Sequence, residues 1–126
     1  MHRPFIPLPL VCAALLAGCP QPATLAQVQD EVFTQSCAFS SCHGSGQEGE
    51  LSLVDAATSA VELIGVQSWE QPGAIRVVAG DSAGSLLFQV LQGEVDPVRQ
   101  MPVNGSVSDQ QLELVRSWID DGAPTE

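Results

Sequence analysis

Four side chains in this 126-residue chain are suited to binding a metal or a cofactor. Cys37 and Cys42 are thiols separated by four residues, and His43 directly follows the second thiol. Met101 offers a thioether in a proline-flanked loop much later in the chain. Beyond the first nineteen residues, His43 is the only histidine and Met101 the only methionine. Any metal bound by an imidazole and a thioether would therefore have to use these two residues.

Two thiols followed by a histidine are typical of covalent haem attachment, in which both sulfurs add to vinyl groups of one porphyrin and the histidine ligates the iron. The usual spacing is Cys-x-x-Cys-His, whereas residues 38–41 separate the thiols here. Two extra residues must bulge outward, which the small side chains of Ser40 and Ser41 permit. The same gap is compatible with a local disulfide in an oxidising compartment. The alternative is therefore a non-haem interaction or structural lipoprotein with a Cys37–Cys42 disulfide.

A soft-ligand copper site is a third and weaker hypothesis for the same residues. Thiolate, imidazole and thioether ligands together suit copper. Zinc is disfavoured because methionine is a poor zinc ligand. Acid–base catalysis is not expected, since the chain beyond residue 19 has no second histidine and the whole chain has no lysine. We therefore do not expect an enzyme.

The charge of the chain excludes one class of partner. Four arginines stand against fifteen Asp and Glu residues, which gives a net charge of -11. Nucleic acid is excluded because phosphate binding needs clustered cations. Such acidity is compatible with a solvated surface, or with steering towards redox partner proteins that have a basic docking face. The length and the 44% hydrophobic composition predict one small domain.

The N-terminus has the pattern of a processing segment. Residues 1–18 combine a modest positive start with an apolar run and are predicted to be a lipoprotein signal peptide. The stretch "LAGC" at residues 16–19 resembles the lipobox of bacterial lipoproteins. This resemblance implies lipidation of Cys19, a tether over residues 19–24 and a domain over residues 25–126. An ordinary secretory signal is the alternative. The resemblance implies a periplasm-facing protein of the cell envelope, held at the membrane by its lipid anchor only. Pro20 stands where aspartate often retains lipoproteins at the inner membrane, so the outer membrane is favoured.

Apolar periodicity and capping residues predict a mainly α protein. Strand patterns are nearly absent apart from "IRVV" at residues 75–78. The region from Glu94 to Ser106 contains two prolines and is predicted to be a loop. Four helices are expected: from a Thr24 cap towards Cys37, from an Asp55 cap to near Gly65, from an Asp81 or Ser82 cap to Gly93, and from a Ser108 cap with Gln111 to Gly122.

The stretches "CAFSSCHG", "QMPVNG" and "SDQQLELVRSWIDDGAP", in this order, resemble small class I c-type cytochromes from about Leu25 to Pro124. This resemblance implies a single domain of about four helices, with the N- and C-terminal helices crossing where Phe33 meets Trp118. It also implies electron transfer by one covalently attached haem c. The cysteine spacing departs from the family's pattern. By this resemblance, the site residues are Cys37 and Cys42 as thioethers, His43 as proximal ligand and Met101 as distal ligand.

A porphyrin would supply apolar bulk that this aromatic-poor chain lacks. Haem propionates need hydrogen-bond donors, and the few available are Arg76, Arg99 and Trp69. The candidate residues for the walls of a haem pocket are Leu51, Leu53, Leu63, Ile64, Leu87, Phe88 and Leu91. As ordinary core residues, these side chains would form the same pattern.

Overall fold

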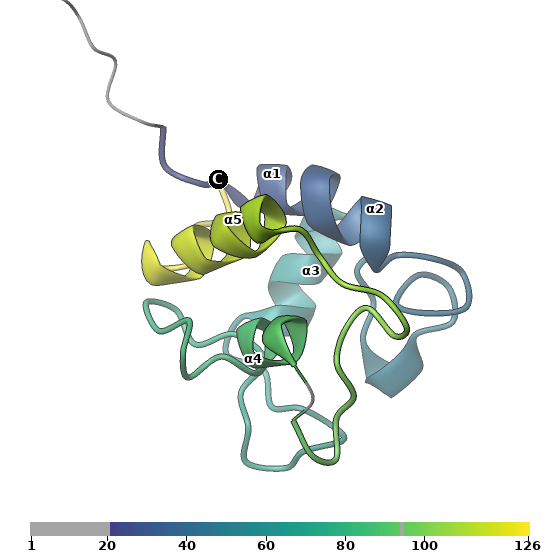
Figure 1. Cartoon of the computed structure of the whole chain (residues 1–126). Helices are drawn as coiled ribbons and strands as arrows, with labels where there is room; N and C mark the ends of the chain where they lie inside the picture. The colour runs from purple at the N-terminus through teal and green to yellow at the C-terminus, as the bar shows by residue number, and fades with distance from the viewer. Residues whose placement is uncertain (1–20, 94) are drawn as a thin grey trace, which may run out of the picture.

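The computed structural model describes residues 21–93 and 95–126, and within them the chain is mainly helical (Figure 1). The described part contains isolated β-bridges but no strand, which confirms the predicted class. The signal peptide, Cys19 and the first residues of the tether lie outside the described residues. The helical elements are α1 (Leu25–Val28), a π-helical turn η1 (Gln29–Phe33), α2 (Thr34–Ser36), a 3₁₀ turn η2 (Glu48–Glu50), α3 (Ala56–Leu63), α4 (Leu86–Gln92) and α5 (Asp109–Asp120).

The N-terminal helix begins where its capping residues predict. The backbone N–H of Gln27 donates to the Thr24 hydroxyl at 3.2 Å, and the Thr24 N–H donates to the Gln27 side chain at 3.1 Å. Elements α1, η1 and α2 then follow one another without a break up to Cys37. The π-helical geometry of the middle turn was not expected from the sequence. Such turns are rare and are often found at functional sites.

Helix α3 also agrees with its predicted bounds. The Asp55 carboxylate accepts a hydrogen bond from the Thr58 N–H at 2.8 Å, which is the main reason why the pKa of this carboxyl is lowered. The helix ends before Gly65, whose φ of 71° lies in the left-handed region that glycine adopts readily. A local cap and a local glycine are therefore enough to bound this helix.

Helix α4 begins later than predicted. Neither Asp81 nor Ser82 caps it, because both belong to a turn that precedes the helix. The Asp81 carboxylate accepts from the Gly84 N–H at 2.9 Å, whereas the Ser82 N–H donates to Asp120 of α5 at 2.9 Å. The helix starts at Leu86 and its last residue is Gln92. Gly93 follows as the C-cap, which agrees with the predicted end.

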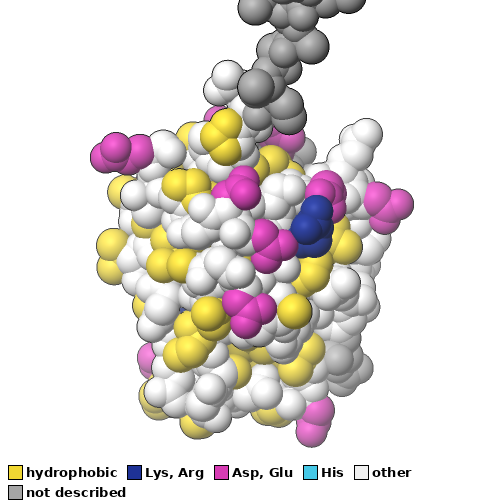
Figure 2. Space-filling model, turned by 90° about the vertical axis from the view of Figure 1, so that its left-hand side faces the viewer, with side chains coloured by type: hydrophobic (Ala, Val, Ile, Leu, Met, Phe, Trp, Pro, Cys, Tyr) yellow, Lys and Arg dark blue, Asp and Glu magenta, His cyan; other side chains and the backbone are white. Residues whose placement is uncertain are grey.

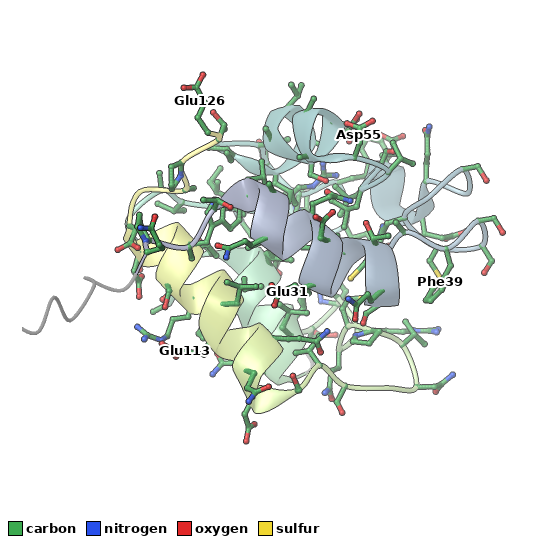
Figure 3. The ribbon with its side chains drawn as sticks, turned by 90° about the horizontal axis from the view of Figure 1, so that it is seen from above. Glu31, Phe39, Asp55, Glu113 and Glu126 are labelled. Carbon is green, nitrogen blue, oxygen red and sulfur yellow. The ribbon has the colours of Figure 1, made fainter. Side chains whose placement is uncertain are left out.

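Helix α5 packs against the N-terminal helix at an angle (Figures 1 and 3). Its Ser108–Gln111 capping box is formed as predicted. The Gln111 side chain also donates to the Glu31 carbonyl at 2.6 Å and so joins the two helices. Phe33 and Trp118 are both fully buried in the main hydrophobic cluster. None of the described helices is both long and apolar enough to cross a bilayer.

Candidate functional site

The described surface contains a cavity of about 760 Å³. This volume lies within the range typical of small-molecule and cofactor sites, about 300–1,000 Å³. The cavity is bounded by the loop after α2, by the segment 51–53, by α4 and by the loop that joins α4 to α5. All four predicted site residues line it: Cys37, Cys42, His43 and Met101. Tertiary structure thus brings Met101 to the same cavity as a motif more than fifty residues earlier in the chain.

The loop that carries the cysteines is closed by its own backbone. The N–H groups of Cys42 and Gly44 both donate to the Phe39 carbonyl, at 2.9 and 3.0 Å. The His43 N–H donates to the Cys37 carbonyl at 3.1 Å. The four residues between the thiols therefore form a compact turn that returns the chain beside Cys37, while the Phe39 side chain points outward into solvent (Figure 3). This turn accommodates the unusual spacing of the motif.

Two glycines after the histidine are required by close backbone contacts. A Cβ atom at Gly44 would lie 2.6 Å from the Ala38 carbonyl oxygen, and one at Gly46 would lie 2.6 Å from the Ser40 carbonyl oxygen. Neither backbone oxygen can move without opening the turn. The sequence analysis did not single out these glycines, although "HGSG" directly after the motif was the available signal.

The imidazole of His43 is held by a backbone carbonyl. Its Nδ1 lies 3.3 Å from the Leu51 oxygen, and the ring is half-buried at the cavity. A carbonyl oxygen only accepts, so the hydrogen of a neutral ring lies on Nδ1 and Nε2 keeps its lone pair. This arrangement leaves Nε2 available as a metal ligand and is the usual way in which proteins orient a ligating histidine.

The two thiols differ in their environments, and both are free cysteines. Cys37 is buried, whereas Cys42 is half-buried. Burial raises the pKa of the Cys37 thiol to about 11, and the neighbouring Cys42 adds to this effect. Cys37 is therefore protonated at neutral pH, and its sulfur lies among apolar neighbours of the main cluster.

Met101 is held in the loop that leaves α4. Its backbone N–H donates to the Val90 carbonyl at 2.8 Å, which ties the loop to the helix. The side chain is half-buried and packs against both hydrophobic clusters of the protein. A thioether at this place lines the same cavity as the imidazole of His43.

All five leucines predicted as walls line the cavity, but the other two predicted residues do not. Ile64 ends α3 and is partly buried against the main cluster, while Phe88 is buried inside that cluster. Leu86, Val90 and Val98 were missed and line the cavity. A signal existed for the first two, because they are spaced by four residues on α4. The predicted leucines that line the cavity are Leu51, Leu53, Leu63, Leu87 and Leu91.

The predicted polar donors are placed in three different ways. Trp69 is 66% exposed and is not part of the cavity wall, so the structure does not place its indole at the cavity. Arg76 lines the cavity but is buried, and it donates to the carbonyls of Glu62, Gly49 and Glu50 at 2.9 to 3.1 Å. Arg76 therefore holds the turn η2, in which Glu50 has a positive φ of 53°. Arg99 is exposed and lines the cavity.

Among the charged side chains on the face shown in Figure 2, acidic ones predominate over basic ones. Glu48 and Glu70 belong to the cavity wall, and Arg99 is the exposed cation there. Over residues 21–93 and 95–126, no group of three or more His, Cys, Asp or Glu side chains is arranged to hold a metal ion.

Comparisons with known proteins add nothing to these observations. No protein-family model, curated protein or solved structure matches this chain. The function therefore has to be argued from the cavity and from the residues that line it.

Proposed function

We propose that this protein carries one covalently attached haem c and serves in electron transfer. In this proposal Cys37 and Cys42 add their sulfurs to the two vinyl groups of the porphyrin, while His43 and Met101 are the axial ligands of its iron. The observation that carries the proposal is that one cavity of about 760 Å³ is lined by all four of these residues.

The chemistry of the cavity wall fits such a group. The aliphatic side chains of the wall come mainly from the segment 51–53 and from α4. His43 presents Nε2 as its free nitrogen because Leu51 occupies Nδ1. The compact loop after Cys37 returns the backbone at His43 to the Cys37 carbonyl despite the four residues between the thiols. These residues bind, orient and shield the group from water.

The bound haem would supply a one-electron iron couple. Ligation by one histidine and one methionine raises its reduction potential, which suits an electron carrier. A methionine on the distal side also occupies the position at which a substrate would bind iron. Together with the lack of a second histidine beyond residue 19, this supports a carrier rather than an enzyme.

Location and partner belong to the same proposal. Lipidation of Cys19 would hold the domain in the cell envelope, facing the periplasm, with the outer membrane favoured. The net charge of -11 and the carboxylates of Glu48 and Glu70 at the cavity favour redox partners with a basic docking face.

An absorption spectrum tests the proposal. The full chain, produced in a bacterial host with a haem-attachment system, should be red, with a Soret band and a sharp α band on reduction. The haem should stay with the chain in denaturing electrophoresis. Ser41→Ala, a change in the same loop that leaves both thiols, is the matched control and should stay red. Colourless, iron-free protein with a Cys37–Cys42 disulfide would overturn the proposal in favour of a structural lipoprotein, and copper without iron would favour the copper site.

A further inference from the structure

A pair of polar side chains is buried deep in the apolar core, away from the cavity wall. Gln29 is 5% exposed and Ser59 is not exposed at all. The Ser59 hydroxyl of α3 donates to the Gln29 amide oxygen at 2.7 Å. Burying an amide and a hydroxyl is unfavourable unless both are hydrogen-bonded, so such a pair calls for an explanation.

The amide nitrogen of Gln29 points to the explanation. Because Ser59 occupies the amide oxygen, the amide nitrogen is directed to the other side, where it donates to the Leu53 carbonyl at 2.8 Å. A second and longer contact of 3.3 Å joins it to the Thr34 hydroxyl. Gln29 lies in the π-helical turn η1, which is the irregular turn of the N-terminal helix.

The segment held by Gln29 in turn holds His43 at two points. The Leu53 N–H donates to the His43 carbonyl at 2.6 Å. Two residues earlier, the Leu51 carbonyl accepts from Nδ1 of the imidazole at 3.3 Å. Hydrogen bonds therefore run without a gap from Ser59 through Gln29 and Leu53 to His43.

We propose that Gln29 and Ser59 are positioning residues for His43, which keep the segment Leu51–Leu53 in the place where its carbonyl orients the imidazole. Neither residue lines the cavity, so both act through the segment. The inference rests on the proposed haem function for its effect on the reduction potential. The series of hydrogen bonds from Ser59 to His43 does not depend on the haem.

The consequence for the reduction potential has a definite sign. A hydrogen bond from Nδ1 makes the imidazole a stronger base, which stabilises the ferric iron and lowers the potential. Loosening the segment weakens that bond and should raise the potential. A general opening of the fold would let water reach the iron, stabilise the more highly charged ferric state and lower the potential. The two effects differ in sign.

The test compares substitutions in the haem-loaded full chain. Gln29→Met removes both hydrogen-bonding groups at similar length, and Ser59→Ala removes only the hydroxyl that orients the amide. Thr34→Val is the matched control, because it removes the contact that does not lead to His43. Val115→Ala, in the fully buried face of α5, is the control for general loss of stability.

Two measurements are made on each variant. For Gln29→Met, the reduction potential should rise by up to about 59 mV, which for a one-electron couple is an up to about tenfold change of the ferric-to-ferrous ratio towards ferrous iron. Ser59→Ala should shift it in the same direction by less, and Thr34→Val should not shift it. Hydrogen exchange of the Leu53 amide should become about tenfold faster in Gln29→Met, as expected for the loss of a buried hydrogen bond.

The outcomes separate this inference from the proposed function. A potential that falls or does not move in Gln29→Met, or that rises equally in Val115→Ala, overturns the positioning role while the protein remains a cytochrome. If the wild-type chain lacks haem, the proposed function fails, and the Leu53 amide still decides the inference. Unchanged protection of that amide in both Gln29→Met and Ser59→Ala then overturns it.

Discussion

The two sides of the described domain differ in how their apolar side chains are arranged. On the helix-pair side, where α5 packs on α1, apolar side chains such as Phe33, Val115, Trp118 and Ile119 are fully buried against one another. On the cavity side, formed by the cysteine loop, segment 51–53, α4 and the methionine loop, apolar walls face the cavity. The helix-pair side is held by direct packing between protein side chains. The cavity side leaves a space of about 760 Å³ between its side chains, so the two sides should respond differently to substitution.

The largest effect is expected from removing both thiols on the cavity side. Cys37→Ala together with Cys42→Ala should abolish haem attachment completely and leave a poorly folded chain, because the cavity walls then lose the group proposed to bury them. Loss of the Soret band and of a cooperative thermal transition in circular dichroism would show this. A double variant with native-like unfolding would mean that the cavity side is ordered by the protein alone.

A smaller but still large effect is expected from the helix-pair side. Trp118→Ala should lower the free energy of unfolding by about 3 to 5 kcal/mol, because it leaves a cavity in a dry core. It also removes the indole that donates to the Pro124 carbonyl at 2.9 Å. Urea unfolding measures the loss, while the visible spectrum of the folded fraction should stay the same. A changed spectrum at low urea would show that the two sides are coupled more tightly than their packing indicates.

Met101→Ala should change the redox chemistry more than the stability. The haem should stay attached while the spectrum changes and the reduction potential falls, because the thioether that favours ferrous iron is lost. The cost in unfolding free energy should be at most about 2 kcal/mol, since the side chain is only half-buried. Val103→Ala, in the same loop, is the control and should leave the spectrum unchanged. An unchanged spectrum in Met101→Ala would mean that another group is the distal ligand.

The smallest effect concerns a contact between the two sides. The Ser82 N–H before α4 donates to the Asp120 carboxylate of α5, and this bond is the main cause of the lowered pKa of Asp120, with Arg116 contributing. The folded-state pKa lies below the unfolded value of about 3.9. The stabilisation is therefore present above about pH 4 and lost as pH falls through the folded pKa.

Urea midpoints of wild type and Asp120→Asn at pH 6 and pH 3 test this linkage. The amide still accepts from Ser82 but does not titrate, so the wild-type advantage at pH 6 should shrink at pH 3. Glu126→Gln, at the exposed end of the chain, is the control and should follow wild type. An advantage that is the same at both pH values would exclude this carboxylate as a link between the two sides.

Features that depend on neighbouring residues in the chain could be predicted. The caps at Thr24, Asp55 and Ser108 and the ends near Gly65 and Gly93 all agree with the structure, because each depends on contacts within a few residues. The start of α4 could not be predicted in this way. Ser82 is a good capping residue by type, but it lies in the turn before the helix, where its backbone N–H donates to Asp120 of a distant helix, and Ser85 occupies the N-cap position.

The candidate site shows the same division. The types of the four predicted site residues and the apolar character of the leucines were visible in the sequence, whereas Gln29 had the appearance of an ordinary polar residue on a helix. Its burial and its bonds to Ser59 and Leu53 arise only when η1, α3 and the segment 51–53 come together. Arg76 likewise donates to the carbonyls of Gly49 and Glu50 in η2, so these hydrogen bonds hold the turn.

The sequence alone determined which chemical groups are available, how far apart they lie along the chain and where three of the four helices start. Those properties follow from residue type and short-range hydrogen bonding. Tertiary structure decided that Met101 lines the same cavity as His43 and that Gln29 is turned inward. These placements depend on which distant segments pack together and exclude water, and the spacing of residues along the chain does not specify which segments pack.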